Sequence, residues 1–388
     1  MRIPLLGALC ALCLVLLAPV APGSATVQAT SPPAAASAAQ RVPALEATRQ
    51  VTGLSNPWDV QALGRGRLLI TERDTGHLLL RENGNTRQVQ FPSDRVWVSG
   101  ETGLMSMEVD PRFGRNGGFY TCQGWLKAGG GHDIRVIAWR LNDAGTVARR
   151  VETLLAGFPT STGRHGGCRL LILRTGALLV GTGDAAIGTN PRNLRSLGGK
   201  TLRMNRTTGR PWPGNPFINS HNRLKRYVHT YGHRNIQGLA QRRDGSLWNA
   251  EHGPGVRDEV NRLRNGGDFG WHPVPGYNES VPMTDHSLPG RQFGARWTSG
   301  PTPATSGAVF VRGNKWGAYE GSLAVACLQG SRVIFMKFDA SGNLRWTRAP
   351  EALRQFGRLR SVTLAPNNDL LVTSDNDTGD AIIRVSPR

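Results

Sequence analysis

Six copies of one short pattern recur along this chain, and they constrain its fold more than any other feature. In each copy a turn containing glycine or asparagine precedes a short apolar segment. The intervals between copies run from roughly 45 to 75 residues, near the upper range of propeller-blade periods. The copies lie at 64–80, 115–125, 174–184, 243–253, 319–338 and 366–385.

The repeated pattern predicts an all-β fold. Its turns are of the Asp-Gly, Thr-Gly and Asn-Asn types that favour tight hairpins, and its apolar segments are rich in Leu, Val, Ile and aromatic residues. No amphipathic run of helical period longer than about three turns follows the first 50 residues. Six repeats of this size predict a six-bladed β-propeller, in which radial closure hides the strand edges. A pair of irregular β-sandwich domains is the alternative.

The first 25 residues have the features of a secretory signal peptide. An apolar run at 3–20 follows the single charge of Arg2, and small residues lead up to Ala25. A retained membrane anchor is the alternative, but Pro19 and Pro22 favour cleavage. We therefore expect a periplasmic or secreted protein that is not membrane-bound once the signal is removed.

Residues 26–50 are rich in Ala, Ser and Pro and carry few large apolar side chains. Such a segment buries too little surface to repay the entropy of ordering, so it is expected to be a flexible tether. The propeller domain is then expected to span residues 51–388.

The chain is strongly basic, with a formal net charge of +20. A field of this sign attracts many kinds of anion. The charges are dispersed and mostly arginine, and no helix-turn-helix, zinc-finger or basic-helix pattern is present, so no specific nucleic-acid partner is expected.

Three cysteines remain beyond the signal segment: Cys122, Cys168 and Cys327. An odd number in an exported protein permits at most one internal bridge with one thiol left over. A bridge between Cys122 and Cys168 is possible, but we expect all three to be small buried thiols.

A propeller brings residues that are distant in sequence to one place, because the inner strand of every blade ends at the same mouth of the central channel. Polar residues follow the repeated strand in the copies, and this placement predicts a site at that mouth. These residues are Thr71, Glu72, Arg73, Gln123, Asp184, Glu251, His252, Gln329, Ser374 and Asp375.

His165 is a candidate general base. It lies in the glycine-rich turn GRHGGCRL, and Asp184 closes the strand that follows. Imidazole titrates near neutral pH, and a neighbouring carboxylate can fix its tautomer. The alternative is a structural histidine.

Two further clusters predict contacts to an anion. Arg234 and Asn235 offer a planar cation and an amide that can hold an oxyanion or a carboxylate. Arg358 and Arg360 are two residues apart, so on an extended segment both point to one face. The alternatives are a polar loop between blades for the first pair and a plain surface pair for the second.

The segment Gly253-Pro254-Gly255 is irregular backbone directly after a strand, and Asp258 and Glu259 follow it. Carbonyl and carboxylate oxygens suit a hard cation such as calcium. No EF-hand or zinc spacing is present, so composition alone makes this prediction weak.

Taken together, the motifs resemble the soluble aldose (glucose) dehydrogenases that depend on pyrroloquinoline quinone (PQQ). The resemblance runs in order from Asn56 to Val385. The segments that carry it are GLMSMEVDPRF, GRHGGCRL, LGGKTLRMN followed by GNPF, YGHRNIQGLA, LWNAEHGP, DEVNRL, GGDFGW and GRLRSVTLAPNNDLLVTSD.

This resemblance implies a six-bladed propeller that is exported to the periplasm and uses calcium and PQQ. It implies that His165 is the base that removes the hydroxyl proton while hydride passes from the anomeric carbon to the quinone, and that Asp184 orients it. It further implies that Arg234 and Asn235 contact the quinone oxygens, with Arg234 stabilising developing charge.

For the rest of the cofactor, the resemblance implies that Arg358 and Arg360 bind its carboxylates. The carbonyls of Gly253 and Pro254 match those that hold the catalytic calcium. Glu259 and the backbone of Phe269 match a second, structural calcium site of some members.

Three positions depart from the family pattern. Gln329 stands where members usually have a lysine that contacts a cofactor carboxylate. Arg164 replaces an acidic sugar-binding residue ahead of His165, and Glu101 replaces a glutamine. The change of charge at the substrate mouth suggests acidic sugars as substrates.

We therefore expect an enzyme that oxidises an aldose to its lactone and passes electrons to a periplasmic acceptor. The alternative is a non-catalytic periplasmic propeller that binds carbohydrate or a protein partner and has lost efficient cofactor binding. A metal-dependent lactonase would need a converging Glu, Asn and Asp ligand set, which the sequence does not supply.

Overall fold

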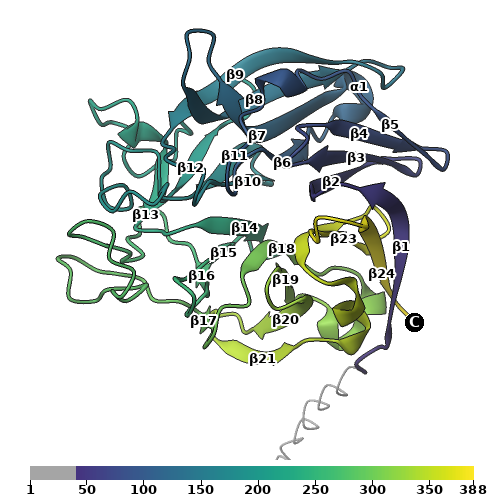
Figure 1. The fold of residues 1–388 in the computed structure, drawn as a ribbon. Coiled ribbons are helices and arrows are strands. Elements are labelled where there is room, and N and C mark those ends of the chain that lie inside the picture. The colour runs from purple at the N-terminus through teal and green to yellow at the C-terminus, as the bar shows by residue number, and fades with distance from the viewer. Residues whose placement is uncertain (1–40) are drawn as a thin grey trace, which may run out of the picture. The chain divides into compact units, whose positions relative to one another are not determined.

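The computed structural model describes residues 41–388, whose strands form six four-stranded antiparallel sheets around a common centre (Figure 1). The predicted all-β, six-bladed propeller is confirmed. The expected signal peptide, residues 1–25, and the first part of the expected tether, residues 26–40, lie outside the described residues.

Each blade is a meander of neighbouring strands. Blade 1 contains β2 (Pro57–Gly64), β3 (Arg67–Glu72), β4 (Leu78–Glu82) and β5 (Asn85–Gln88). Blade 2 contains β6 (Leu104–Val109), β7 (Gly118–Leu126), β8 (His132–Leu141) and β9 (Ala148–Phe158). Blade 3 contains β10 (Gly167–Ile172), β11 (Ala177–Thr182), β12 (Lys200–Asn205) and β13 (Val228–Tyr231).

The remaining blades repeat this order. Blade 4 contains β14 (Ile236–Gln241), β15 (Leu247–Glu251), β16 (Glu259–Arg262) and β17 (Trp297–Thr298). Blade 5 contains β18 (Thr305–Phe310), β19 (Leu323–Cys327), β20 (Arg332–Phe338) and β21 (Leu344–Arg348). Blade 6 contains β22 (Leu359–Leu364), β23 (Leu370–Ser374), β24 (Asp380–Pro387) and β1 (Leu45–Leu54). Short helices lie at α1 (Phe113–Asn116), η1 (Ser93–Arg95), η2 (Lys225–Tyr227), η3 (Asn314–Tyr319) and η4 (Glu351–Phe356).

The first strands of the six blades form the inner ring: β2, β6, β10, β14, β18 and β22 each contact the next, and β22 contacts β2. The repeated apolar segments are therefore the second strands of their blades, not the inner strands as we expected. The reason is that the turn of each repeat connects the first strand of its blade to the second, so the inner strand comes before the turn.

The residues expected at the site still lie together, although they follow the second strands and not the inner strands. First and second strands are antiparallel, so the start of each inner strand lies beside the end of its neighbour. In the registers, Gly167 pairs with Thr182 and Ile236 pairs with Glu251. Residues that precede inner strands therefore meet residues that follow second strands at one end of the ring.

Strand β1 completes blade 6 by pairing with β24 from the other end of the described chain, with Leu45 opposite Pro387 and Leu54 opposite Asp380. Residues 45–50, which we expected in the tether of residues 26–50, belong to this strand. The strand was not recognised because it is an outer edge strand whose central residues, Thr48 to Gln50, are exposed and polar.

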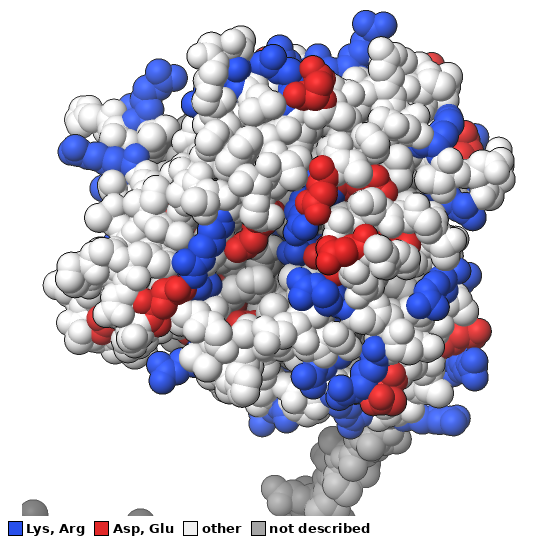
Figure 2. Space-filling model, viewed as in Figure 1, with Lys and Arg blue, Asp and Glu red and all other residues white. Residues whose placement is uncertain are grey.

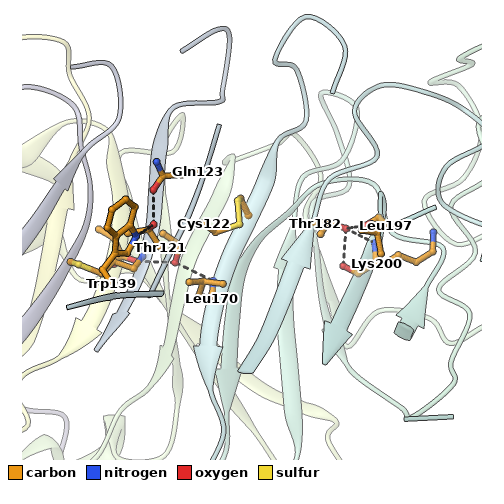
Figure 3. Close-up of a disulfide and its surroundings, with 12 residues drawn as sticks. Thr121, Cys122, Gln123, Trp139, Leu170, Thr182, Leu197 and Lys200 are labelled. Atoms are coloured by element: carbon orange, nitrogen blue, oxygen red, sulfur yellow. Dashed lines mark hydrogen bonds between the residues drawn. A yellow bond between two sulfur atoms is a disulfide. The ribbon is translucent and has the colours of Figure 1, made fainter. Parts of the chain in front are cut away.

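A disulfide joins Cys122 on β7 to Cys168 on β10 and so links blades 2 and 3 (Figure 3). Both cysteines are buried in an apolar cluster that includes Leu170 on β10. The expectation of three free thiols is wrong for this pair, while Cys327 is free and buried. The count of three cysteines allowed either three free thiols or one disulfide. The disulfide forms because the packing of blades 2 and 3 brings Cys122 and Cys168 together.

A buried ion pair between Asp59 and Arg169 lies among the inner strands of the ring. Asp59 on β2 accepts hydrogen bonds from Ser106 Oγ and the Met107 amide of blade 2 at 3.0 and 3.1 Å. It also accepts one from Arg169 Nη1 of blade 3 at 3.0 Å and one from Ser361 Oγ of blade 6 at 3.0 Å. Asp59 therefore ties its own blade to three others.

Candidate active site

The expected pair of His165 and Asp184 forms at the end of the ring where inner strands begin. His165 lies two residues before β10 with a φ of 55°, a left-handed backbone conformation that turns its buried side chain inward. Its Nδ1 lies 2.8 Å from Asp184 Oδ1, and Asp184 lies two residues after the end of β11. Figure 2 shows a hollow at the centre of the viewed face, with acidic and basic side chains gathered around it.

Asp184 has two further partners that sequence reasoning missed. Trp271 Nε1 and the Tyr277 hydroxyl donate to Asp184 Oδ2 at 2.8 and 2.7 Å. Both residues lie in the long connection between β16 and β17. The motif GGDFGW contains Trp271, but nothing in its pattern indicated that the indole reaches the carboxylate.

Lys200 supports the loop that follows Asp184. Its buried Nζ donates to the carbonyls of Asn190, Pro191 and Gly198 at 2.7, 2.9 and 2.7 Å. Burial lowers the pKa of Lys200 to about 7, against the attraction of Asp184. Asn190 Nδ2 in turn donates to the Asp184 carbonyl at 2.9 Å, so this loop fixes the backbone of Asp184.

Glu101 lies beneath the site and joins its two main loops. Its carboxylate accepts hydrogen bonds from the His165 amide at 3.1 Å, from Asn235 Nδ2 at 2.8 Å and from Gln237 Nε2 at 3.2 Å. Burial would raise the pKa of Glu101, but His165, His252 and these hydrogen bonds hold it below its ordinary value. Glu101 therefore positions His165 and Asn235, although we expected it at the substrate mouth.

Arg234 lies two residues before β14 and is almost fully buried. Its amide donates to Glu251 Oε2 at 2.9 Å and its Nη1 donates to the His252 carbonyl at 3.1 Å. Its Nη2 pairs with Glu279, and its buried Nε has no partner among residues 41–388. The N–H of Arg234 Nε is therefore available to donate a hydrogen bond to a ligand.

Arg164 is exposed at the mouth, but its charge is compensated. Its Nη2 donates to both carboxylate oxygens of Glu279, at 2.8 and 2.7 Å. Although burial alone would raise the pKa of Glu279, its bonds to Arg164 and Arg234 lower it. One carboxylate therefore bridges two guanidinium groups from different loops, and Arg164 does not present a free positive charge.

Arg358 and Arg360 both reach Asp375, which follows β23. Arg360 is buried, and its Nη2 and Nε donate to Asp375 Oδ2 at 2.7 and 3.1 Å. Arg358 is exposed, and its Nε donates to the Asp375 carbonyl at 3.0 Å. The expected pair is thus brought together, with one guanidinium buried and one open to solvent.

Gln329 lies in the turn between β19 and β20, where its side chain is exposed. No hydrogen bond of this side chain is found within the described part of the chain. Arg332 begins β20 in the same hairpin, and its buried Nε lacks a partner among the described residues.

The segment at Gly253 and Pro254 forms a tight turn. A Cβ on Gly253 would lie 1.9 Å from the Val256 carbonyl oxygen, so only glycine fits there. The Gly253 amide donates to Asp258 Oδ1 at 3.0 Å, and the Gly253 carbonyl accepts from the Gly255 amide at 3.1 Å. The turn gathers backbone and carboxylate oxygens, the donor type that calcium prefers.

Glu259 is buried at the start of β16. Asn261 Nδ2 and Thr284 Oγ1 each donate to it at 3.3 Å. Burial and the neighbouring Glu251 raise the pKa of Glu259 to about 8. The side-chain oxygen of Asn261 is buried without a partner among residues 41–388. A bound cation would satisfy this oxygen and offset the repulsion between the two carboxylates.

Two kinds of feature are absent from residues 41–388. No cluster of three or more His, Cys, Asp and Glu side chains in this range is arranged to hold a metal ion. No helix in the same range combines the length and the apolar character needed to cross a membrane.

Two proteins to which this chain is similar are named sugar dehydrogenases. The chain is 28% identical over 300 residues to the aldose sugar dehydrogenase YliI of Escherichia coli strain K12, covering 76% of this chain and 79% of the relative. It is 24% identical over 396 residues to quinoprotein glucose dehydrogenase B of Acinetobacter calcoaceticus, covering 81% and 82%.

Two similar solved structures are also aldose sugar dehydrogenases. The apo form of the soluble aldose sugar dehydrogenase from Escherichia coli matches with a TM-score of 0.79 and 25% identity, covering 89% of this chain and all of that chain. The PQQ-bound aldose sugar dehydrogenase from Streptomyces coelicolor matches with a TM-score of 0.74 and 25% identity, covering 89% and 98%.

The sequence profile of the glucose / sorbosone dehydrogenase family matches residues 54–384, which is nearly all of the described chain. The predicted resemblance is therefore confirmed. The chain belongs to the glucose / sorbosone dehydrogenase family and is a sugar oxidoreductase of its PQQ-dependent type.

Proposed function

We propose that this chain oxidises an aldose at its anomeric carbon to the lactone, with PQQ and calcium as cofactors and His165 as the general base. The observation that carries the proposal is the pairing of His165 Nδ1 with Asp184 at 2.8 Å beside the buried Arg234. An oriented imidazole can act as the general base that removes a proton. A buried guanidinium beside it can stabilise the negative charge that develops.

Side chains of the protein take different parts in the proposed reaction. Asp184 accepts the Nδ1 proton of His165, so the lone pair of Nε2 is free to take the proton of the anomeric hydroxyl. As the carbonyl of the lactone forms, the anomeric carbon gives up its hydrogen with two electrons. Bound PQQ would supply the two-electron acceptor for that hydride. Arg234 and Asn235 would hold the acceptor by hydrogen bonds from a guanidinium and an amide.

Hydrogen-bond donors near His165 and Glu101 would suit a flat polyanion such as PQQ. Arg234 Nε and His252 Nε2 are buried and lack partners among residues 41–388. Arg358 adds an exposed guanidinium, and Arg360 a buried one. Gln329 in place of a cation removes one charge-assisted contact, worth roughly 1.5 to 3 kcal/mol, so we expect weaker cofactor binding than in members that keep the lysine.

Calcium fits the oxygen donors of two places. Gly253 and Pro254 would supply carbonyl oxygens to a catalytic ion, and such an ion would provide Lewis-acid polarisation of a carbonyl. Glu259, with the Phe269 carbonyl, would hold a structural ion. The buried, unpartnered oxygen of Asn261 supports the second site.

We also propose that the chain is exported to the periplasm, with residues 1–25 as its signal, and passes electrons to an acceptor there. The disulfide between Cys122 and Cys168 supports an oxidising compartment, because such bridges are rare in the cytosol.

Reconstitution tests the proposal. Purified protein is mixed with calcium and PQQ, and quinone absorbance and dye reduction are recorded across a panel of aldoses. We expect bound quinone and dye reduction that need both cofactors. A protein that binds no quinone at micromolar concentration would instead be the carbohydrate- or protein-binding propeller considered as the alternative.

A further inference from the structure

We propose that Tyr277 is a positioning residue for the base, with its hydroxyl holding the Asp184 carboxylate in the orientation that receives the imidazole N–H of His165. The proposal rests on the proposed function, because His165 acts as a base only if the chain oxidises a sugar.

The two oxygens of Asp184 have separate partners. Oδ1 faces His165 Nδ1 and the Ala186 amide, each at 2.8 Å. Oδ2 receives Trp271 Nε1 at 2.8 Å and the Tyr277 hydroxyl at 2.7 Å. Because Oδ2 is held by two donors, the carboxylate cannot rotate away from His165 without breaking both hydrogen bonds. Tyr277 and Trp271 therefore decide which oxygen faces the imidazole.

Tyr277 also acts on the imidazole itself. Its hydroxyl oxygen lies 2.9 Å from His165 Nδ1, so this nitrogen faces both the phenol oxygen and Asp184 Oδ1. The phenol proton is directed to Asp184, which leaves a lone pair of the phenol oxygen toward Nδ1. A proton on Nδ1 satisfies both oxygens, and the basic lone pair then stays on Nε2.

The phenol remains a donor over the working pH range. Burial and the charge of Asp184 raise the pKa of Tyr277 well above its ordinary value. A phenolate in this place would repel the carboxylate, so the geometry requires the protonated form.

The ring of Tyr277 is held from its other side. Arg164 lies 5.6 Å from the ring centroid and pairs with Glu279, two residues further along the chain. Glu279 also pairs with Arg234. These contacts fasten the connection between β16 and β17 over the site and fix the position of the phenol.

The test compares Tyr277→Phe with the wild type, both reconstituted with PQQ and calcium. The phenyl ring keeps the packing and only the hydroxyl is lost. We expect kcat to fall by about tenfold with the KM for the sugar unchanged, which is the pattern for a lost transition-state interaction. Tyr227→Phe is the matched control, since this half-buried tyrosine lies outside the site, and it should keep wild-type activity.

A double substitution separates positioning from a general structural effect. In an Asp184→Asn background, Tyr277→Phe should cost less than about twofold more, because both residues act through the same carboxylate. If Tyr277→Phe keeps the wild-type kcat, or loses the same factor in both backgrounds, the proposal is wrong. Trp271→Phe, which removes the other donor to Oδ2, gives the same test if Tyr277→Phe does not fold.

A measurement without cofactor separates this proposal from the proposed function. In cofactor-free protein with ¹⁵N-labelled histidine, NMR reports which ring nitrogen of His165 carries the proton. We expect the Nδ1–H form in the wild type and in Tyr227→Phe, and a mixture of tautomers in Tyr277→Phe. An unchanged tautomer in Tyr277→Phe would overturn the positioning role, whereas an inactive wild type with the expected tautomer shift would overturn only the dehydrogenase function.

Discussion

Glu279 forms an ion pair with Arg164, in which both of its carboxylate oxygens accept hydrogen bonds from Arg164 Nη2, at 2.8 and 2.7 Å. Because Glu279 compensates Arg164, the preference for acidic sugars suggested by Arg164 alone loses its physical basis. We expect the wild-type enzyme to turn over glucose at least as well as glucuronate. Glu279→Gln frees two guanidinium groups and should shift the ratio of kcat/KM values toward glucuronate.

Steady-state kinetics on both sugars, with PQQ held at saturation, measures this ratio. Glu351→Gln, which removes an exposed carboxylate far along the chain in η4, serves as the control for a simple change in net charge. A wild type that favours glucuronate would contradict the prediction and restore the acidic-sugar hypothesis.

Replacing the base should separate chemistry from cofactor binding. His165→Gln cannot accept the hydroxyl proton, so kcat should fall by about 10²–10⁴-fold. Its affinity for PQQ, followed by quinone absorbance in a titration, should stay at the wild-type value because the guanidinium groups remain. His221→Gln, an exposed histidine, should behave as the wild type. Retained activity in His165→Gln would assign the proton transfer to another group.

The ion pair of Asp59 and Arg169 should be important for stability. Asp59 is 1% exposed and Arg169 is 5% exposed, so Asp59→Ala leaves a buried cation without its counter-charge. We expect the free energy of unfolding to fall by about 3–5 kcal/mol in chemical denaturation. Glu351→Ala breaks an exposed pair with Arg354 and should cost less than about 1 kcal/mol. Equal losses in the two variants would disprove a special role for the central pair.

The disulfide should stabilise the contact between blades 2 and 3. Cys122 and Cys168 are 46 residues apart, and replacing both with alanine should lower the free energy of unfolding by roughly 2–4 kcal/mol. Unfolding with and without a reductant measures the effect. The double variant should not respond to the reductant, while Cys327→Ala should keep the wild-type response. A reductant effect that survives in the double variant would place its origin elsewhere.

Glu108 should give the fold a defined pH dependence. Burial and the nearby Asp59 raise the pKa of Glu108 to about 8, although Arg169 opposes them. A raised pKa means that the folded state holds the proton more tightly than the unfolded state, so this contribution to stability falls as pH rises from about 4.5 to about 8. Glu108→Gln should flatten the pH dependence of the unfolding midpoint in this range. An identical pH profile in the variant would show that Glu108 ionises without cost.

The repeated turn-and-strand pattern in the sequence was enough to predict the ring of six blades. It also predicted the part of the site that the loops before the inner strands and after the second strands supply. The turn of each repeat leads from the first to the second strand of its blade, and the antiparallel pairing of these strands places His165 beside Asp184 and Ile236 beside Glu251. The sequence therefore predicted which loops meet. It did not predict which strand is innermost, because the inner and second strands are both short and apolar.

The rest of the site depends on tertiary structure that has no local signal. Trp271, Tyr277 and Glu279 come from a connection without regular strands between β16 and β17, where no period predicts the direction of a side chain. The compensation of Arg164 by Glu279 joins residues 115 positions apart. For Gln329, the family resemblance identified the position in the sequence. It did not predict that the residue is exposed in its turn.

The pairing of β1 with β24 has a consequence for how the protein is made. Blade 6 takes its outermost strand from the start of the described chain and its other three from the end, so the ring can close only when residues near 387 are available. During synthesis, every earlier stage leaves an open arc with uncovered sheet edges and without a closed ring around a central channel. The uncovered edges of such an arc offer hydrogen-bonding groups to other chains, so the folding protein is exposed to aggregation until its last strand is available.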